Sequence, residues 1–126
     1  MAGLTLDSGA LIAAERGDRS FWAIWKEAEA RDTDVTVPAP VVAQVFRGAT
    51  SAVVARLLRA CVVEPLDDAL ARRVGRLCGE ARVADIVDAT VIAGAAARGD
   101  DVLTSDVEDL KKLAVRARGA GQILRV

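Results

Sequence analysis

Residues 4–12 read LTLDSGALI: a short apolar stretch, an acidic residue and a second apolar run. The first part predicts a buried β-strand, and Asp7 marks its end. Ser8 follows at a position from which its hydroxyl would cap a helix over residues 9–16. Residues 101–115 repeat the arrangement, with a strand over 101–105 and a helix that starts at Asp106. Both segments therefore predict a strand that leads into a helix through an aspartate.

The rest of the chain continues this alternation. Further strands are predicted over 34–38, 62–63 and 122–125, and further helices over 18–31, 41–47, 51–60, 67–81 and 85–98. Strands separated by helices tend to pair in parallel, with the helices covering both faces of the sheet. We therefore expect a three-layer α/β/α sandwich with a mainly parallel central sheet. No repeat, linker or low-complexity stretch divides the chain, so residues 1–126 are expected to form a single domain.

The composition excludes several kinds of chemistry. The 126 residues include no His and no Tyr, and only two Trp and two Phe. Catalysis by Ser-His-Asp or Cys-His and metal sites with His ligands are therefore excluded. A nucleic-acid platform of stacked aromatic side chains is not expected either. The net charge of −1 argues against one broad basic face but leaves a local basic groove open.

Two features bear on the compartment. No apolar run approaches the roughly 18 residues of a membrane span, so we expect a soluble cytoplasmic protein with no membrane partner. Cys61 and Cys78 lie far apart and form no CxxC pair. Because both lie in apolar surroundings, we expect two buried thiols in a reducing compartment.

Three aspartates are expected to meet at one edge of the sheet. Asp7 and Asp106 follow strands, and Asp88 lies in the first turn of the helix over 85–98. In open α/β sheets, ligands bind beyond the carboxyl ends of the strands. Clustered carboxylates suit Mg²⁺ or Mn²⁺, which prefer oxygen ligands. Helix capping is the alternative for each aspartate singly, although at Asp7 the neighbouring Ser8 could cap instead.

Four segments of this chain resemble, in order, the motifs of PIN-domain nucleases. They are residues 4–12, residues 37–47 (VPAPVVAQVFR), residues 86–93 (IVDATVIA) and residues 102–110 (VLTSDVEDL). The size and layout are most similar to the toxin half of VapBC toxin–antitoxin pairs. The resemblance implies a Mg²⁺- or Mn²⁺-dependent endoribonuclease that a small antitoxin holds inactive. It also implies a homodimer, for which the helix with Trp22 and Trp25 is one candidate interface.

Carried over residue by residue, the resemblance assigns the acidic positions of the site. Asp7, Asp88 and Asp106 match the first, third and fourth acids of the family. Gln44 stands where the second motif usually has Glu, so it is assigned to the catalytic set without a negative charge. Asp85, one helical turn before Asp88, is an auxiliary metal ligand or simply a cap. We assign Asp109 to the surface or to a partner contact.

The expected mechanism follows from the absence of His. No side chain of neutral pKa is available as a general base, so a metal-bound water is the expected nucleophile. Candidate RNA contacts are Arg47, one turn after Gln44, and the hydroxyls of Ser8, Thr104 and Ser105. Several arginines of the central helices could follow phosphates, or could simply form solvated helix faces: Arg56, Arg59, Arg72, Arg73, Arg76 and Arg82.

Other readings of the sequence remain open. A PIN domain weakened by Gln44 could act by binding RNA or protein without cleaving it. A response-regulator receiver expects an acidic pair at the first strand, where this chain has Leu6 before Asp7. A haloacid-dehalogenase-type phosphatase needs a second Asp at the position of Gly9. A Rossmann cofactor domain needs a GxGxxG motif directly after the first strand, and this chain has none there.

Overall fold

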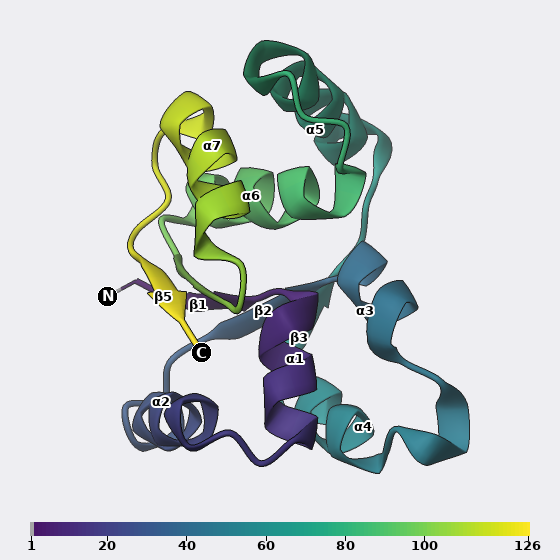
Figure 1. Ribbon diagram of the computed structural model, residues 1–126, viewed down its shortest axis with the longest axis vertical. Helices are drawn as coiled ribbons and strands as arrows, with labels where there is room; N and C mark the ends of the chain where they lie inside the picture. Colours follow the sequence, from purple (N-terminus) through teal and green to yellow (C-terminus); the bar gives the residue numbers. More distant parts are fainter. Residues whose placement is uncertain (1) are drawn as a thin grey trace.

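A computed structural model of the chain describes residues 2–126 and contains one five-stranded sheet (Figure 1). The strands are β1 (Leu4–Leu6), β2 (Val35–Pro38), β3 (Val62–Glu64), β4 (Asp101–Thr104) and β5 (Ile123–Arg125). Their spatial order is β3-β2-β1-β4-β5, and every neighbouring pair is parallel. The predicted parallel sheet is therefore confirmed.

Helices cover both faces of the sheet, as a parallel sheet requires. In Figure 1, α1 (Ser8–Glu15), α2 (Arg19–Ala30) and α4 (Ala52–Arg59) lie below the sheet. Above it lie α5 (Asp68–Ala81), α6 (Ile86–Arg98) and α7 (Val107–Ala117). The short helix α3 (Ala39–Val45) follows β2 directly and contacts both α1 and α6. The expected three-layer α/β/α sandwich is confirmed.

The buried core explains the order of the strands. All residues of β1 and β2 are buried, whereas Val62 and Val63 of the edge strand β3 are exposed. Most of α6 is buried, and its small residues let it pack closely on the sheet and on α5 and α7. The central strand β1 therefore lies between β2 and β4, beneath the most buried helix.

The sequence-based boundaries agree with the structure except around α3. The helix predicted over 41–47 begins at Ala39 and ends at Val45, and a 3₁₀ turn over Gly48–Thr50 follows that was not predicted. Pro40 lies in the first turn of α3, where its missing N–H costs nothing.

One expectation about side chains needs correction. Cys61 and Cys78 are both free thiols, but they are partly exposed rather than buried. Trp25 is buried, and the indole Nε1 of Trp22 donates to the Ala14 carbonyl at 3.2 Å. These tryptophans therefore contribute to packing within their own chain, and Trp22 remains partly exposed. In residues 2–126, no helix is long and apolar enough to cross a membrane.

Candidate functional site

Asp7 and Asp106 lie at the same edge of the sheet because β1 and β4 are parallel neighbours. The pairing places Leu6 opposite Leu103, so both strands end at the same level. The backbone N–H of Asp7 donates to the Leu103 carbonyl at 3.2 Å. Each strand then passes through an aspartate into a helix. The topology thus brings together two acids that are separated by most of the chain.

Asp7 is held rigidly at this edge. Its side chain is 5% exposed and caps α1, with one carboxylate oxygen accepting the Ala10 N–H at 2.9 Å. The other oxygen accepts a hydrogen bond from the Thr104 hydroxyl. Asp7, not Ser8, is therefore the N-cap of α1, because the extended backbone at Asp7 is the conformation of a cap residue. Burial raises the pKa of Asp7, while the bonds from Thr104, Ala10 and Gly9 oppose the rise.

Thr104 links the two loops that carry these aspartates. Its hydroxyl donates to Asp7 and accepts the backbone N–H of Asp106 at 2.8 Å. The side chain has no exposed surface, so it is unavailable to RNA and the phosphate-contact interpretation is wrong for Thr104. Its neighbour Ser105 is exposed. The two loops approach so closely that a Cβ on Gly9 would overlap the Ser105 hydroxyl.

Asp88 and Asp85 occupy the start of α6. A carboxylate oxygen of Asp85 caps the helix by accepting the Asp88 N–H at 3.0 Å, so the capping alternative applies to Asp85. The pKa of Asp88 is raised to about 6. Partial burial is the largest cause, and the charges of the neighbouring acids come next: Asp85, Asp7, Asp106 and Asp109. All four carboxylates therefore act on Asp88 electrostatically.

Asp109 is exposed, as the sequence predicted, and its charge also acts on the acidic cluster through Asp88. A side-chain hydrogen bond with Asp106, and then the charge of Asp106, raise the pKa of Asp109. The spacing of three residues along α7 places both on one side of the helix, which is the signal that could have identified the pair. Asp106 stands at the N-cap position of α7 but caps no backbone N–H with its side chain.

The acidic cluster at the ends of parallel strands is accompanied by a match to a known family. Residues 4–116 match the model of the PIN domain. The chain belongs to the PIN domain family. A comparison with curated proteins finds no match. A solved structure with the same fold is the "Crystal structure of VapBC2 from Rickettsia felis bound to a DNA fragment from their promoter". The match has a TM-score of 0.71 at 12% identity and covers 86% of this chain and 91% of that one.

The acids of this PIN domain suit a divalent cation in charge and in donor chemistry. In residues 2–126, none of the five clustered carboxylates forms a salt bridge with Lys or Arg: Asp7, Asp85, Asp88, Asp106 and Asp109. Within the same residues, no three acidic or Cys side chains form a ready-made group of metal ligands. Both oxygens of Asp7 already accept hydrogen bonds. The oxygens therefore match Mg²⁺ or Mn²⁺ in type, and side-chain rotation would be needed to bring them together.

The remaining predicted site residues differ in how they are placed. Gln44 is exposed on α3, and α3 contacts α1 and α6, whose first turns lie in the acidic cluster. The Arg47 guanidinium donates to the Ala43 and Phe46 carbonyls at 3.1 and 3.0 Å. Arg47 thus satisfies carbonyls at the end of its own helix and shows no contact with the acids. Ser8 is partly exposed in the first turn of α1.

Proposed function

We propose that this PIN domain is a metal-dependent endoribonuclease of the VapC type, which hydrolyses RNA phosphodiester bonds in the cytoplasm. The observation that carries the proposal is the cluster of five carboxylates beside the ends of β1 and β4, four of which help to raise the pKa of Asp88. Because none of these five carboxylates forms a salt bridge with Lys or Arg in residues 2–126, a bound divalent cation is the usual way to relieve such repulsion. The membership of the PIN domain family supports the same conclusion.

Asp7, Asp88 and Asp106 would hold Mg²⁺ or Mn²⁺, with Asp85 as an auxiliary ligand. A cation bound by these oxygens lowers the pKa of a coordinated water and offsets the charge on the scissile phosphate. Asp7 contributes a fixed carboxylate, because Thr104 and the start of α1 hold both of its oxygens. Asp88 contributes its negative charge only above its pKa of about 6.

Gln44 would complete the catalytic set as a neutral group. Its amide oxygen can bind a cation or hold a coordinated water, but it adds no negative charge. Asp85 brings a charge to the same edge and acts on Asp88 more strongly than any other carboxylate. We infer that Asp85 supplies the charge that Gln44 lacks. By family resemblance, the product is an RNA with a 5′-phosphate end.

We also propose a protein partner. The solved structure that shares this fold is named for a VapBC2 complex bound to DNA. By analogy, a small VapB-type antitoxin would bind this chain and hold it inactive, and the free chain would form a homodimer. The RNA contacts proposed for Arg47, Ser8 and Ser105 belong to this hypothesis. Thr104, being buried, instead positions Asp7.

Cleavage of a total-RNA pool by the purified protein tests the nuclease. We expect discrete cuts with Mn²⁺ that disappear with EDTA and in the Asp7→Asn and Asp88→Asn variants. Asp68→Asn is the matched control, because this exposed aspartate lies on α5 and pairs only with Arg72. The proposal is wrong if cutting survives in EDTA or if all three variants cut alike.

A second function is favoured by the amide at Gln44. A PIN domain with one charge fewer would bind its cation more weakly and could act by binding RNA or protein alone. Binding of RNA that is unaffected by Mn²⁺, with no cleavage by folded and antitoxin-free protein, would support this function over the nuclease.

A further inference from the structure

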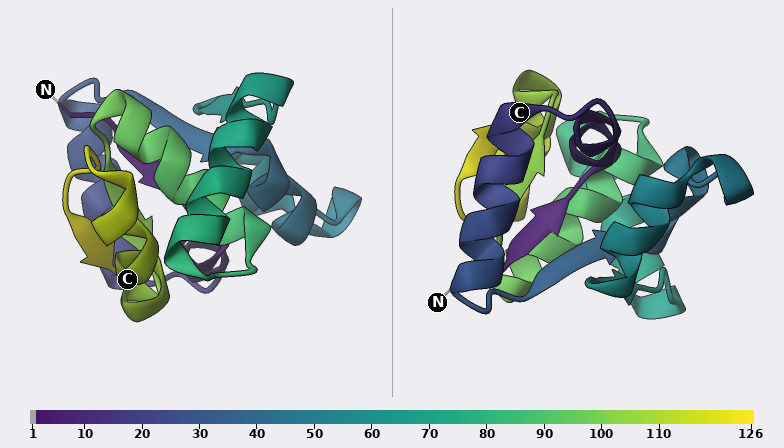
Figure 2. Two further views of the ribbon diagram at one scale, coloured as in Figure 1. Left: turned by 90° about the horizontal axis from the view of Figure 1, so that it is seen from above. Right: turned by 90° about the horizontal axis from the view of Figure 1, so that it is seen from below.

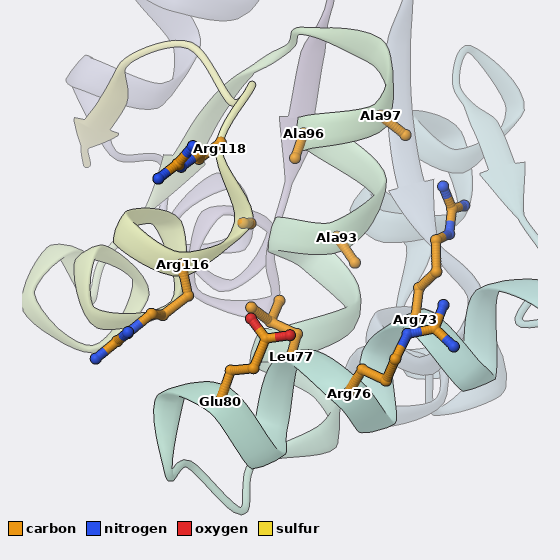
Figure 3. Close-up of a pocket in the computed structure, with 10 residues that line it drawn as sticks. Arg73, Arg76, Leu77, Glu80, Ala93, Ala96, Ala97, Arg116 and Arg118 are labelled. Atoms are coloured by element: carbon orange, nitrogen blue, oxygen red, sulfur yellow. The ribbon is translucent and has the colours of Figure 1, made fainter.

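A cavity lies above α6, between α5 and α7 (Figure 3). Seen from above in the left view of Figure 2, α5 and α7 flank α6, and α6 contacts both. The cavity measures about 290 Å³ and is lined by residues of all three helices. We call it the arginine groove, after the four arginines of its lining: Arg73, Arg76, Arg116 and Arg118.

The four arginines stand on opposite sides of the groove. Arg73 and Arg76 come from α5, whereas Arg116 and Arg118 come from the end of α7, as Figure 3 shows. All four side chains are exposed, and within residues 2–126 none pairs with a carboxylate. Glu80 is the one acid among the lining residues. The groove therefore carries an excess of three positive charges in a protein whose net charge is −1.

The shape of the groove results from short side chains. Its floor consists of Ala93, Ala96 and Ala97 of α6. A methyl group at each of these positions leaves room for a ligand between the two taller helices. The lining contains no aromatic residue, so bases cannot be held by stacking on aromatic rings. A nucleic-acid ligand would be bound through its negative charges rather than through its bases.

Other cavities of the molecule lack this charge. The cavity beside α1 and Ser105 is lined by Arg16 together with Asp18. The cavity between α2 and α4 is lined by Arg56 together with Glu29. In each of them one acid accompanies a single arginine. The concentration of unpaired arginines at the α5–α7 groove is therefore not a general property of this surface.

The groove and the acidic cluster share one helix. Asp88 lies in the first turn of α6, and the alanine floor begins five residues later. At 1.5 Å per residue, the floor lies about 8–14 Å along the helix from Asp88. A polymer that reaches the acids could therefore also reach the groove.

We propose that the arginine groove binds the phosphate backbone of single-stranded RNA next to the bond that is cleaved. This inference rests on the proposed function, since RNA is the substrate proposed there. The acidic cluster repels a polyanion, and the bound cation offsets only part of that repulsion. The substrate therefore needs a positively charged binding site elsewhere. RNA carries a negative charge on every nucleotide. This regular spacing of charge matches the arginines three residues apart on α5 better than the scattered acids of a protein would. Guanidinium groups bind phosphate through paired N–H donors.

Fluorescence anisotropy of a labelled single-stranded RNA of mixed sequence, in EDTA, tests the groove without requiring cleavage. The double variant Arg73→Gln/Arg76→Gln is compared with Arg19→Gln/Lys26→Gln, which removes the same charge from exposed positions of α2. We expect the α5 variant to bind at least about tenfold more weakly than the control. The slope of log affinity against log salt should also fall by about 1.4, since each single-strand phosphate contact contributes about 0.7.

A second variant separates shape from charge. Ala97→Phe would fill the groove without changing the net charge, and it should also weaken RNA binding. Far-UV circular dichroism checks that each variant is folded. The proposal is overturned if the α5 variant binds RNA as tightly as the control. It is also overturned if polyglutamate, but not RNA, depends on Arg73 and Arg76.

Different results would reject the RNA-binding groove and the proposed nuclease activity. Arginine-dependent RNA binding without cleavage would support the groove and reject the nuclease. Cleavage whose KM is the same in the α5 variant and its control would support the nuclease and reject the groove. If both hold, the α5 variant should show a raised KM and an unchanged kcat at saturating RNA, because the groove binds phosphates that neighbour the cleaved bond and not the reacting phosphate itself.

Discussion

The hydroxyl of Thr104, at the end of β4, donates a hydrogen bond to the carboxylate of Asp7, at the end of β1. The same hydroxyl accepts the backbone N–H of Asp106. One buried side chain therefore sets the relative positions of two proposed metal ligands. Its neighbours in sequence are exposed or apolar, so no nearby residue duplicates this role.

Replacing Thr104 by valine should weaken both the fold and the site. Thr104→Val leaves one carboxylate oxygen of the buried Asp7 and the Asp106 N–H without their partner, at a cost of about 1–3 kcal/mol in the free energy of unfolding. The pKa of Asp7 should rise further, because the bond from Thr104 opposes its rise. Urea unfolding and RNA cleavage measure the two effects. Thr104→Ser keeps the hydroxyl and should remain close to wild type; equal losses in both variants would contradict the assignment.

The raised pKa of Asp88 predicts how stability depends on pH. The folded protein holds the proton up to a pKa of about 6, whereas the unfolded chain releases it near 3.8. The folded state therefore binds more protons in this window, and the free energy of unfolding falls as the pH rises from about 4 to 6. Asp88→Asn lacks this contribution and should be more stable than wild type at pH 7 in EDTA.

Adding Mg²⁺ should reverse the order of stability, so that wild type becomes more stable than Asp88→Asn. A bound cation stabilises only the folded state, so the Tm of wild type should rise with its concentration. The Tm of Asp88→Asn should respond much less. Because protons compete with the cation for Asp88, the response should weaken below about pH 6. Thermal unfolding over a pH series measures both effects, and equal Mg²⁺ responses at pH 7 would argue against Asp88 as a ligand.

Gly9 should tolerate no side chain. A Cβ at this position would overlap the Ser105 Oγ and come within 3.0 Å of the Ser105 backbone N. Gly9→Ala should therefore force the α1 and β4–α7 loops apart, lowering the free energy of unfolding by about 1–3 kcal/mol and reducing cleavage. In the double variant with Ser105→Gly, part of the loss should be recovered. Equal losses in the single and double variants would place the strain elsewhere.

Arg98 should be far more important to stability than an exposed arginine. Its guanidinium donates to Asp100 at 2.8 Å, Glu64 at 2.7 Å and Thr5 at 3.0 Å, joining the end of α6 to the middle of β1, the end of β3 and the residue before β4. Arg98→Leu leaves two partly or fully buried carboxylates unpaired and should cost about 3 kcal/mol. Arg31→Leu, which breaks an exposed pair with Glu27, should cost less than about 1 kcal/mol. Urea unfolding compares the two, and similar losses would show that the Arg98 network adds nothing.

Restoring a carboxylate at Gln44 should strengthen cation binding. Gln44→Glu adds a negative charge on α3 and should tighten Mn²⁺ binding roughly tenfold if it faces the cluster. Ala43→Glu adds the same charge on the preceding residue of α3. That residue is also exposed, but on a helix it points in a different direction from Gln44. Calorimetric titration with Mn²⁺ compares the two. Identical affinities would remove Gln44 from the site.

The sequence by itself determined the order of the elements and the acids at their junctions. Apolar runs that end at Asp7 and before Asp106 identify strands, and the caps Asp18, Asp67 and Asp85 mark helix starts within a residue. These are local patterns, and each depends on residues only a few positions apart. The alternation of strands and helices then leads to a parallel sheet through general rules of connection.

Only the tertiary structure decided which side chains meet. The bond between Thr104 and Asp7 spans 97 positions and depends on β1 and β4 being neighbours in the sheet. The same is true of the arginine groove, whose two pairs of arginines belong to helices brought together only by packing on α6. The sequence favoured Ser8 as the cap of α1, whereas the extended backbone at Asp7 makes Asp7 the cap. Such contacts follow from how elements stack, which local patterns do not specify.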